Sequence, residues 1–79
     1  SELEAAVAQI YAEVLGVEKV SATDNFFALG GDSLRATQVL ARVRAMLDVN
    51  LSIATIFWHS TVTDLAHEIL GAIAARDDD

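Results

Sequence analysis

The 79-residue sequence contains no cysteine, only five basic residues and no long apolar run. Without cysteine the chain can form neither a disulfide nor a thiolate metal site, and it has no cysteine nucleophile. A cysteine-free chain suits the cytoplasm, where we expect it to reside. Twelve acidic residues give a net charge of −7, which argues against nucleic acid as a partner, because phosphates require a basic surface. No apolar run approaches the roughly 20 residues that span a bilayer, so no membrane association is expected.

The composition is that of one small folded domain. Hydrophobic residues make up 53% of the chain, which is ample for a core, and the length leaves no room for a second domain. We expect the domain to occupy residues 1–76 and the three aspartates at 77–79 to form an acidic tail. Two histidines and scattered carboxylates form no metal-ligand pattern, so no metal site is expected.

Helical start and stop signals mark the first element. Ser1 followed by Glu4 matches a capping box, and Gly16 stands where a left-handed C-cap residue is expected. Apolar residues recur at helical spacing between them. The pattern predicts a helix over residues 2–15.

Residues 16–32 have no sustained period and predict a long loop. We expect Phe26 and Phe27 to pin this loop to the core, since each buried ring contributes roughly 1.5–3 kcal/mol. A second helix is predicted from Ser33 to just before Asp48, with Asp32 as its N-cap. Its apolar stripe consists of Ala36, Val39, Leu40, Val43 and Leu47.

The remaining chain predicts two more helices. Ser52 can cap a short turn over 53–57, and Thr61 opens a last helix in which Asp64 forms the acidic half of a capping pair. No window alternates as a half-buried strand would. The sequence therefore predicts an all-α four-helix bundle, with three longer helices, one short helix and a long loop between the first and second helices.

One segment carries candidate chemistry. Gly30 and Gly31 permit a tight turn that leaves room for a partner, and Asp32 can accept from backbone amides of the next helix. Ser33 would then expose its hydroxyl at the helix N-terminus, where the free amides and the dipole favour an attached anion such as a phosphodiester. A plain capping role explains the same residues, because many helices begin with Asp-Ser.

The stretch from Asp24 to Leu34 closely resembles the core motif of peptidyl carrier domains, also called thiolation domains, of non-ribosomal peptide synthetases. Those domains carry a D-x-F-F-x-L-G-G-[HD]-S-L pattern, and every fixed position is met here. The resemblance extends over nearly the whole chain, including residues 10–16, 53–57 and 61–66. Around the short helix the sequence departs from the family: serines at 52 and 60 stand where proline is frequent, and Trp58-His59 replaces a commoner Glu-Ala.

The resemblance implies a carrier that is not itself an enzyme. A separate phosphopantetheinyl transferase, using Mg²⁺, would join the Ser33 hydroxyl to the β-phosphate of coenzyme A, with Gly30, Gly31 and Asp32 supporting the site. The resulting 4'-phosphopantetheine would hold aminoacyl or peptidyl groups as thioesters. Implied partners are the transferase, an adenylation domain, and condensation, epimerisation, thioesterase or tailoring enzymes, and the chain is expected to be monomeric.

The outward face of the second helix is a candidate docking surface for these partners. Leu34, Thr37 and Ala41 recur near helical spacing beside Ser33, while Arg35 and Arg42 can add steering charge. An incidental exposed leucine is the simpler explanation of Leu34. For Trp58, partly buried packing and interface use are equally consistent with the sequence.

Two other functions share the same serine. An acyl or aryl carrier of polyketide, fatty-acid or siderophore type has the same mechanism, although its second helix is often acidic. A more distant alternative is a serine esterase, because residues 31–34 spell G-D-S-L and residues 64–67 spell D-x-x-H. Ser33, His67 and Asp64 would then be nucleophile, base and orienting acid, but the chain lacks the length and strands of those larger α/β hydrolases.

Overall fold

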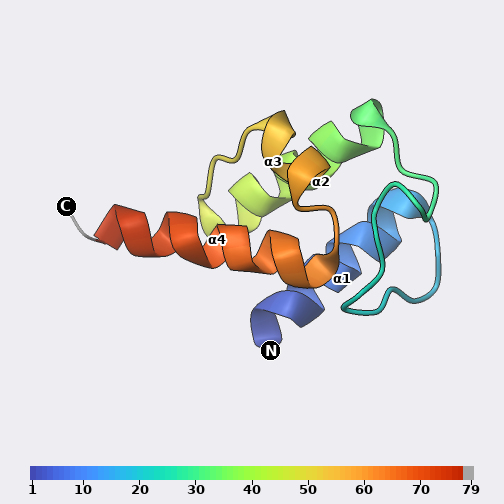
Figure 1. Cartoon of the computed structure of the whole chain (residues 1–79), viewed down its shortest axis with the longest axis horizontal. Coiled ribbons are helices and arrows are strands. Elements are labelled where there is room, and N and C mark those ends of the chain that lie inside the picture. The colour runs from blue at the N-terminus through green and yellow to red at the C-terminus, as the bar shows by residue number, and fades with distance from the viewer. Residues whose placement is uncertain (78–79) are drawn as a thin grey trace.

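The computed structural model describes residues 1–77 and consists of four helices (Figure 1). They are α1 (Glu2–Leu15), α2 (Ser33–Leu47), α3 (Ile53–Trp58) and α4 (Val62–Asp77). The described residues contain no strand, so the predicted all-α bundle with one short helix is confirmed. Residues 78 and 79 of the expected acidic tail lie outside the described residues, whereas Asp77 is the last residue of α4.

The caps of α1 and α2 form as the sequence predicts. The Ser1 hydroxyl accepts from the Glu4 amide in a capping box, and Gly16 ends α1 in the left-handed region at φ 69°. Asp32 caps α2 through its side chain. The left-handed residue that ends α2 is Asp48, at φ 56°, whose amide donates to the carbonyl of Arg44.

The last two helices differ slightly from expectation. Helix α3 continues through Trp58, one residue further than predicted, and the Ser52 hydroxyl meets the Thr55 hydroxyl at 3.1 Å rather than a backbone amide. Helix α4 begins at Val62, where the Thr61 hydroxyl accepts from the Asp64 amide at 3.1 Å. A residue with a side-chain hydroxyl, Ser52 or Thr61, therefore precedes the first residue of each helix.

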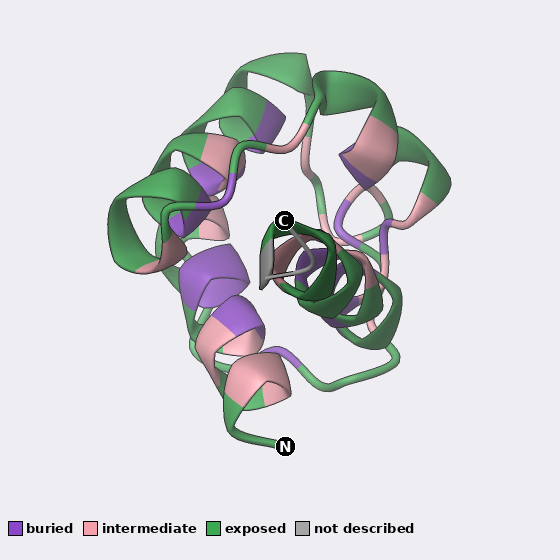
Figure 2. Cartoon of the chain, turned by 90° about the vertical axis from the view of Figure 1, so that its left-hand side faces the viewer, coloured by how far each residue is buried: buried purple, intermediate pink, exposed green. Residues whose placement is uncertain are grey.

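One core joins all four helices and the long loop. Figure 2 shows the buried segments turned toward the interior of the bundle. The largest fully buried side chains come from every helix and from the loop: Tyr11, Phe26, Ile56, Leu65, Ile69, Val7, Val39, Val43 and Val62. Because each helix buries only one apolar stripe, the stripes must pack together to exclude water.

Backbone hydrogen bonds hold the loop of residues 16–32 against the start of α4. The Phe26 amide donates to the carbonyl of Ser60 at 3.0 Å, and the Thr63 amide donates to the carbonyl of Ala22 at 3.0 Å. Asn25 and Thr61 form an isolated antiparallel bridge between the same two segments. These bonds fix the path of a connection that has no helix of its own.

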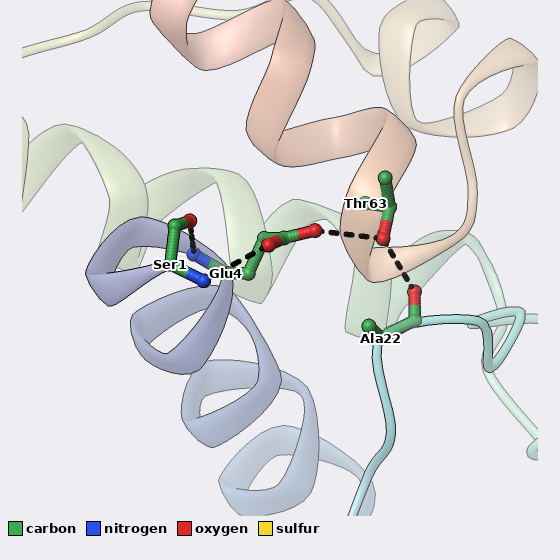
Figure 3. A network of polar contacts seen from close by, with 4 residues as sticks. All are labelled: Ser1, Glu4, Ala22 and Thr63. Atoms are coloured by element: carbon green, nitrogen blue, oxygen red, sulfur yellow. Dashed lines mark hydrogen bonds and ion pairs between the residues drawn. The ribbon is translucent and has the colours of Figure 1, made fainter.

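A polar network fastens the N-terminal end of α1 to the same place (Figure 3). The Thr63 hydroxyl lies 2.8 Å from Glu4 Oε2 and 3.1 Å from the carbonyl oxygen of Ala22. The hydrogen bond from Thr63 and the nearby N-terminal ammonium group of Ser1 lower the pKa of Glu4. One hydroxyl thus links α1, the loop and α4.

Candidate functional site at the start of α2

Ser33 is the first residue of α2 and is exposed. Asp32 Oδ1 accepts from the amide of Arg35 at 2.9 Å, and its carbonyl accepts from Ala36 at 2.8 Å. Within residues 1–77, the Ser33 hydroxyl and the amides of Ser33 and Leu34 have no hydrogen-bond partner. The helix therefore begins with a free hydroxyl beside two free N–H donors, an arrangement that suits an attached anion.

The turn before Ser33 is held by close packing of Gly31 on Phe26. The Gly31 amide donates to the carbonyl of Phe26 at 3.0 Å. A Cβ on Gly31 would lie 2.7 Å from that carbonyl oxygen and would overlap two carbons of the Phe26 ring. The neighbouring Gly30 has φ 104°, a backbone conformation that favours glycine. Each glycine thus meets a different requirement of the same turn.

Polar side chains at the start of the segment shape the backbone upstream of this turn. Asp24 Oδ2 accepts from the amide of Ser21 at 2.8 Å. Asn25 Oδ1 accepts from the amides of Phe27 and Ala28, at 2.9 and 3.2 Å. Such side-chain bonds to nearby amides stabilise turns in place of helix or sheet bonds.

Four aromatic rings run from the core to the surface beside the site. Tyr11 and Phe26 have ring centroids 4.8 Å apart, Phe26 and Phe27 meet edge-to-face at 5.3 Å, and Phe27 stacks on Phe57 at 4.8 Å. Phe26 is fully buried, Phe27 is half-buried and Phe57 is exposed. The expectation that the two loop phenylalanines pin the loop to the core holds fully for Phe26 and partly for Phe27.

Phe57 belongs to this region although sequence reasoning did not single it out. Its ring stacks on the loop while much of it remains exposed. The one signal in the sequence was its place beside Trp58 at the end of a short helix. The contact connects the loop that carries the glycine turn to α3.

Tyr11 anchors the inner end of the aromatic row. Its hydroxyl donates to the carbonyl of Ser60 at 2.9 Å, and burial, with a smaller effect of the Asp64 charge, raises its pKa. The buried Ser60 hydroxyl lies 2.7 Å from the carbonyl oxygen of Ile56 and 3.0 Å from that of Phe57. At this departure from the family pattern, serine supplies a donor to the end of α3 that proline would lack.

The two arginines expected to steer partners are both engaged within the chain. Arg35 Nη1 lies 2.8 Å from Asp32 Oδ2, and Arg42 Nη1 lies 2.7 Å from Glu13 Oε1. Each pair is about half exposed. The charges of these two α2 arginines are therefore partly neutralised, by the N-cap Asp32 and by Glu13 of α1.

The apolar residues proposed to dock partners lie on the surface. Leu34 is 69% exposed, and Thr37 and Ala41 are also exposed on α2. The Thr37 hydroxyl donates to the carbonyl of Leu34 at 2.6 Å. Trp58 is 82% exposed, so packing in the core does not account for it.

The esterase alternative gains no support from the geometry. His67 and Thr63 line a shallow pocket with Ser1 and Glu4 at the start of α1, and Ser33 is not among the lining residues. Within the part of the chain that the structure describes, no hydrogen bond or ion pair joins Ser33, His67 and Asp64 to one another. The other histidine, His59, lies 3.8 Å from Glu68. The G-D-S-L spelling arises from the glycine turn and the helix cap.

Over residues 1–77, no group of three or more His, Cys, Asp or Glu side chains could hold a metal ion. None of the helices in that range is both long enough and apolar enough to cross a bilayer.

Comparison with known proteins shows to which family a chain with this site belongs. The family described as "Phosphopantetheine attachment site" matches residues 5–69. The chain belongs to this family. It is a peptidyl carrier domain, as the resemblance implied, and the group that its family carries is 4'-phosphopantetheine.

Relatives agree in sequence and in fold. A linear gramicidin synthase polypeptide of Brevibacillus parabrevis is 49% identical over 67 residues, which cover 85% of this chain and 1% of that protein. A solved structure named "Non Ribosomal PCP domain" is 45% identical, with a TM-score of 0.78, over 85% of this chain and 86% of the other. A peptidyl carrier protein in complex with the phosphopantetheine transferase Sfp and coenzyme A is 35% identical, with a TM-score of 0.84, over 87% and 90% of the two chains. The carrier domain thus spans a very small part of its synthetase relative.

The residues at the start of α2 fit the family's group. Attachment requires an accessible hydroxyl, which Ser33 provides, and a phosphodiester requires hydrogen-bond donors, which the amides of Ser33 and Leu34 provide. Neither glycine before Ser33 has a side chain that would obstruct an approaching protein.

Proposed function

We propose that Ser33 is the attachment residue and that the domain presents aminoacyl or peptidyl groups to successive enzymes of non-ribosomal peptide synthesis. The observation that carries this proposal is the exposed, unbonded Ser33 hydroxyl at the first position of α2, within the residues matched by the family. Gly30, Gly31 and Asp32 support it by fixing the turn and capping the helix.

In the attachment reaction the Ser33 oxygen forms a bond to the β-phosphorus of coenzyme A. The bond from that phosphorus to the oxygen bridging the two phosphates breaks, and adenosine 3',5'-bisphosphate leaves. The Ser33 proton passes to a base of the transferase. When attached, the group supplies a thiol that holds cargo as a thioester. The domain itself orients the hydroxyl, and we propose that it catalyses no step.

Leu34, Thr37, Ala41 and Trp58 are proposed to contact partners, because all four are exposed and three share the helix of Ser33. Burying an exposed apolar side chain in a partner's pocket releases water and favours association. Arg42, together with Arg35, would influence the approach through charge, reduced by the acids with which these arginines pair.

The carrier is proposed to be a monomer and to work in the cytoplasm; its expected boundary at residue 76 moves by one residue, because α4 continues through Asp77. Its proposed partners are a phosphopantetheinyl transferase, an adenylation domain, and condensation, epimerisation, thioesterase or tailoring enzymes. The transferase finds support in the solved complex of a similar carrier with Sfp.

Intact mass spectrometry tests the attachment residue. The chain is incubated with coenzyme A, Mg²⁺ and a broad-specificity phosphopantetheinyl transferase, beside Ser33→Ala and the exposed-serine control Ser21→Ala. The wild type and Ser21→Ala should each gain one phosphopantetheine unit, while Ser33→Ala should gain none and keep the helical circular dichroism of the wild type. Loading of a folded Ser33→Ala variant would overturn the proposal.

A further inference from the structure

Asp32 and Arg35 form a charged pair on either side of Ser33. Asp32 is the N-cap of α2, and Arg35 is the third residue of its first turn. One carboxylate oxygen accepts from the Arg35 amide at 2.9 Å, and the other lies 2.8 Å from Arg35 Nη1. The guanidinium is thereby drawn back across the first turn of the helix, on the side of the cap.

Attachment at Ser33 adds a second negative charge next to this pair. A phosphodiester carries one negative charge at neutral pH, and it would be placed one residue from the Asp32 carboxylate. Like charges at such short separation repel, even where solvent screens them. A nearby cation that can bind both groups would offset this repulsion.

Arg35 is the one basic residue between positions 20 and 41. Arg42 lies nine residues beyond Ser33 and is paired with Glu13 at 2.7 Å. Arg76 donates to the carbonyl of Asp48 at the opposite end of α2, at 2.8 Å. A guanidinium has five N–H donors, so Arg35 can keep Asp32 and still donate to a phosphate oxygen.

We propose that Arg35 is a positioning residue for the phosphodiester at Ser33, shared between that group and Asp32. This inference rests on the proposed attachment at Ser33. It assigns Arg35 a role within the loaded carrier, in addition to any effect on partner approach. The consequence is that Arg35 should matter more to the loaded domain than to the unloaded one.

Chemical unfolding of unloaded and loaded chains tests the proposal. Wild type, Arg35→Gln, Arg35→Lys and the control Arg42→Gln are loaded with coenzyme A by a transferase, and the mass of each product is verified. The Arg42 control removes an ion pair of similar length and exposure on the same helix, away from Ser33. The measured quantity is the ratio of the unfolding constants of the loaded and unloaded forms.

Arg35→Gln should raise this ratio about two- to fivefold relative to the wild type, the size expected for one partly exposed charge pair. Arg42→Gln should leave the ratio at its wild-type value. Arg35→Lys keeps the positive charge and should therefore give a ratio close to that of the wild type. Because the effect is electrostatic, it should shrink at 1 M salt. Asp32→Asn keeps a good N-cap but removes the carboxylate charge, so it should lower the ratio below that of the wild type.

Equal ratios for Arg35→Gln and Arg42→Gln would overturn the proposal, as would an Arg35→Gln effect that does not change with salt. Failure of the wild type to gain mass in the first step would instead contradict the attachment at Ser33. The two inferences are therefore tested separately by the same experiment.

Discussion

Gly31→Ala should destabilise the domain and slow its loading, although the change adds a single methyl group. The new Cβ would lie 2.7 Å from the carbonyl oxygen of Phe26, and closer still to two carbons of the Phe26 ring. The ring cannot easily move away, because it is fully buried between Tyr11 and Phe27. The Phe26 carbonyl is fixed as well, since it accepts from the Gly31 amide.

The size of the effect follows from this rigidity. Inserting a methyl group into a well-packed core costs roughly 1–3 kcal/mol, and a rigid site places Gly31→Ala near the upper end. A domain of this length has a free energy of unfolding of about 4–12 kcal/mol. A loss of about 3 kcal/mol would lower the melting temperature by roughly 12–24 °C. Because the displaced turn leads directly into Ser33, the loading rate should also fall under conditions where the variant is folded.

Gly71→Ala is the matched control. Gly71 lies in α4, is exposed, and has no atom outside its own helix within 4 Å of an added Cβ. Alanine is about 1 kcal/mol better than glycine in a helix, so this change should raise the unfolding free energy. Urea unfolding, followed by circular dichroism, measures the unfolding free energy of both variants, which should fall for Gly31→Ala and rise for Gly71→Ala. A Gly31→Ala variant as stable as the wild type would refute the packing argument.

Three further changes probe the core and the polar contacts. Tyr11→Phe removes the hydrogen bond to Ser60 and should lower the unfolding free energy by about 1 kcal/mol at neutral pH. Because the folded-state pKa of Tyr11 is raised, the wild type should lose stability as the pH rises above about 10. Denaturation at several pH values should show that this loss is smaller in the variant. Thr63→Val removes the largest cause of the lowered Glu4 pKa, so this pKa should rise toward its ordinary value in an NMR titration, and an unchanged Glu4 titration would contradict the assigned cause. In the wild type, the lowered pKa of Glu4 contributes stability at neutral pH that is lost as the pH falls through the folded-state pKa. Val43→Asp places a charge at a site that is 1% exposed and should abolish the cooperative unfolding transition, whereas a cooperative transition near that of the wild type would show that the site tolerates charge.

Helix positions were predictable from the sequence because the signals were local. Ser1 with Glu4, Gly16 and Asp32 mark helix ends through bonds to residues at most four positions away, and the structure contains each of these caps. The same local signals placed Ser33 at a helix N-terminus, whereas its choice as attachment residue depended on the resemblance to peptidyl carrier domains. The apolar stripe of α2 likewise depends only on spacing along one helix.

Contacts between distant residues were not predictable, since no local pattern specifies them. The bond from Thr63 to Glu4 joins residues 59 positions apart, and the stack of Phe27 on Phe57 depends on how the loop meets α3. The engagement of Arg42 by Glu13 also requires the packing of α1 beside α2. The sequence could show that these residues were polar or aromatic, but only the fold supplies their partners.

The motif that leads to Ser33 is largely a structural device, and this would explain how Ser33, as the proposed attachment residue, can serve several enzymes. Asp24 and Asn25 accept hydrogen bonds within the loop, and Asp32 caps α2. Phe26 fills the core, and Gly31 leaves room for the Phe26 ring to pack against the turn. Ser33, Leu34 and Ala28 are left as exposed residues whose side chains have no such role. A rigid turn lowers the entropy lost when a partner binds, because the hydroxyl is already displayed. The domain can then offer the same small target to each partner without rearranging its core.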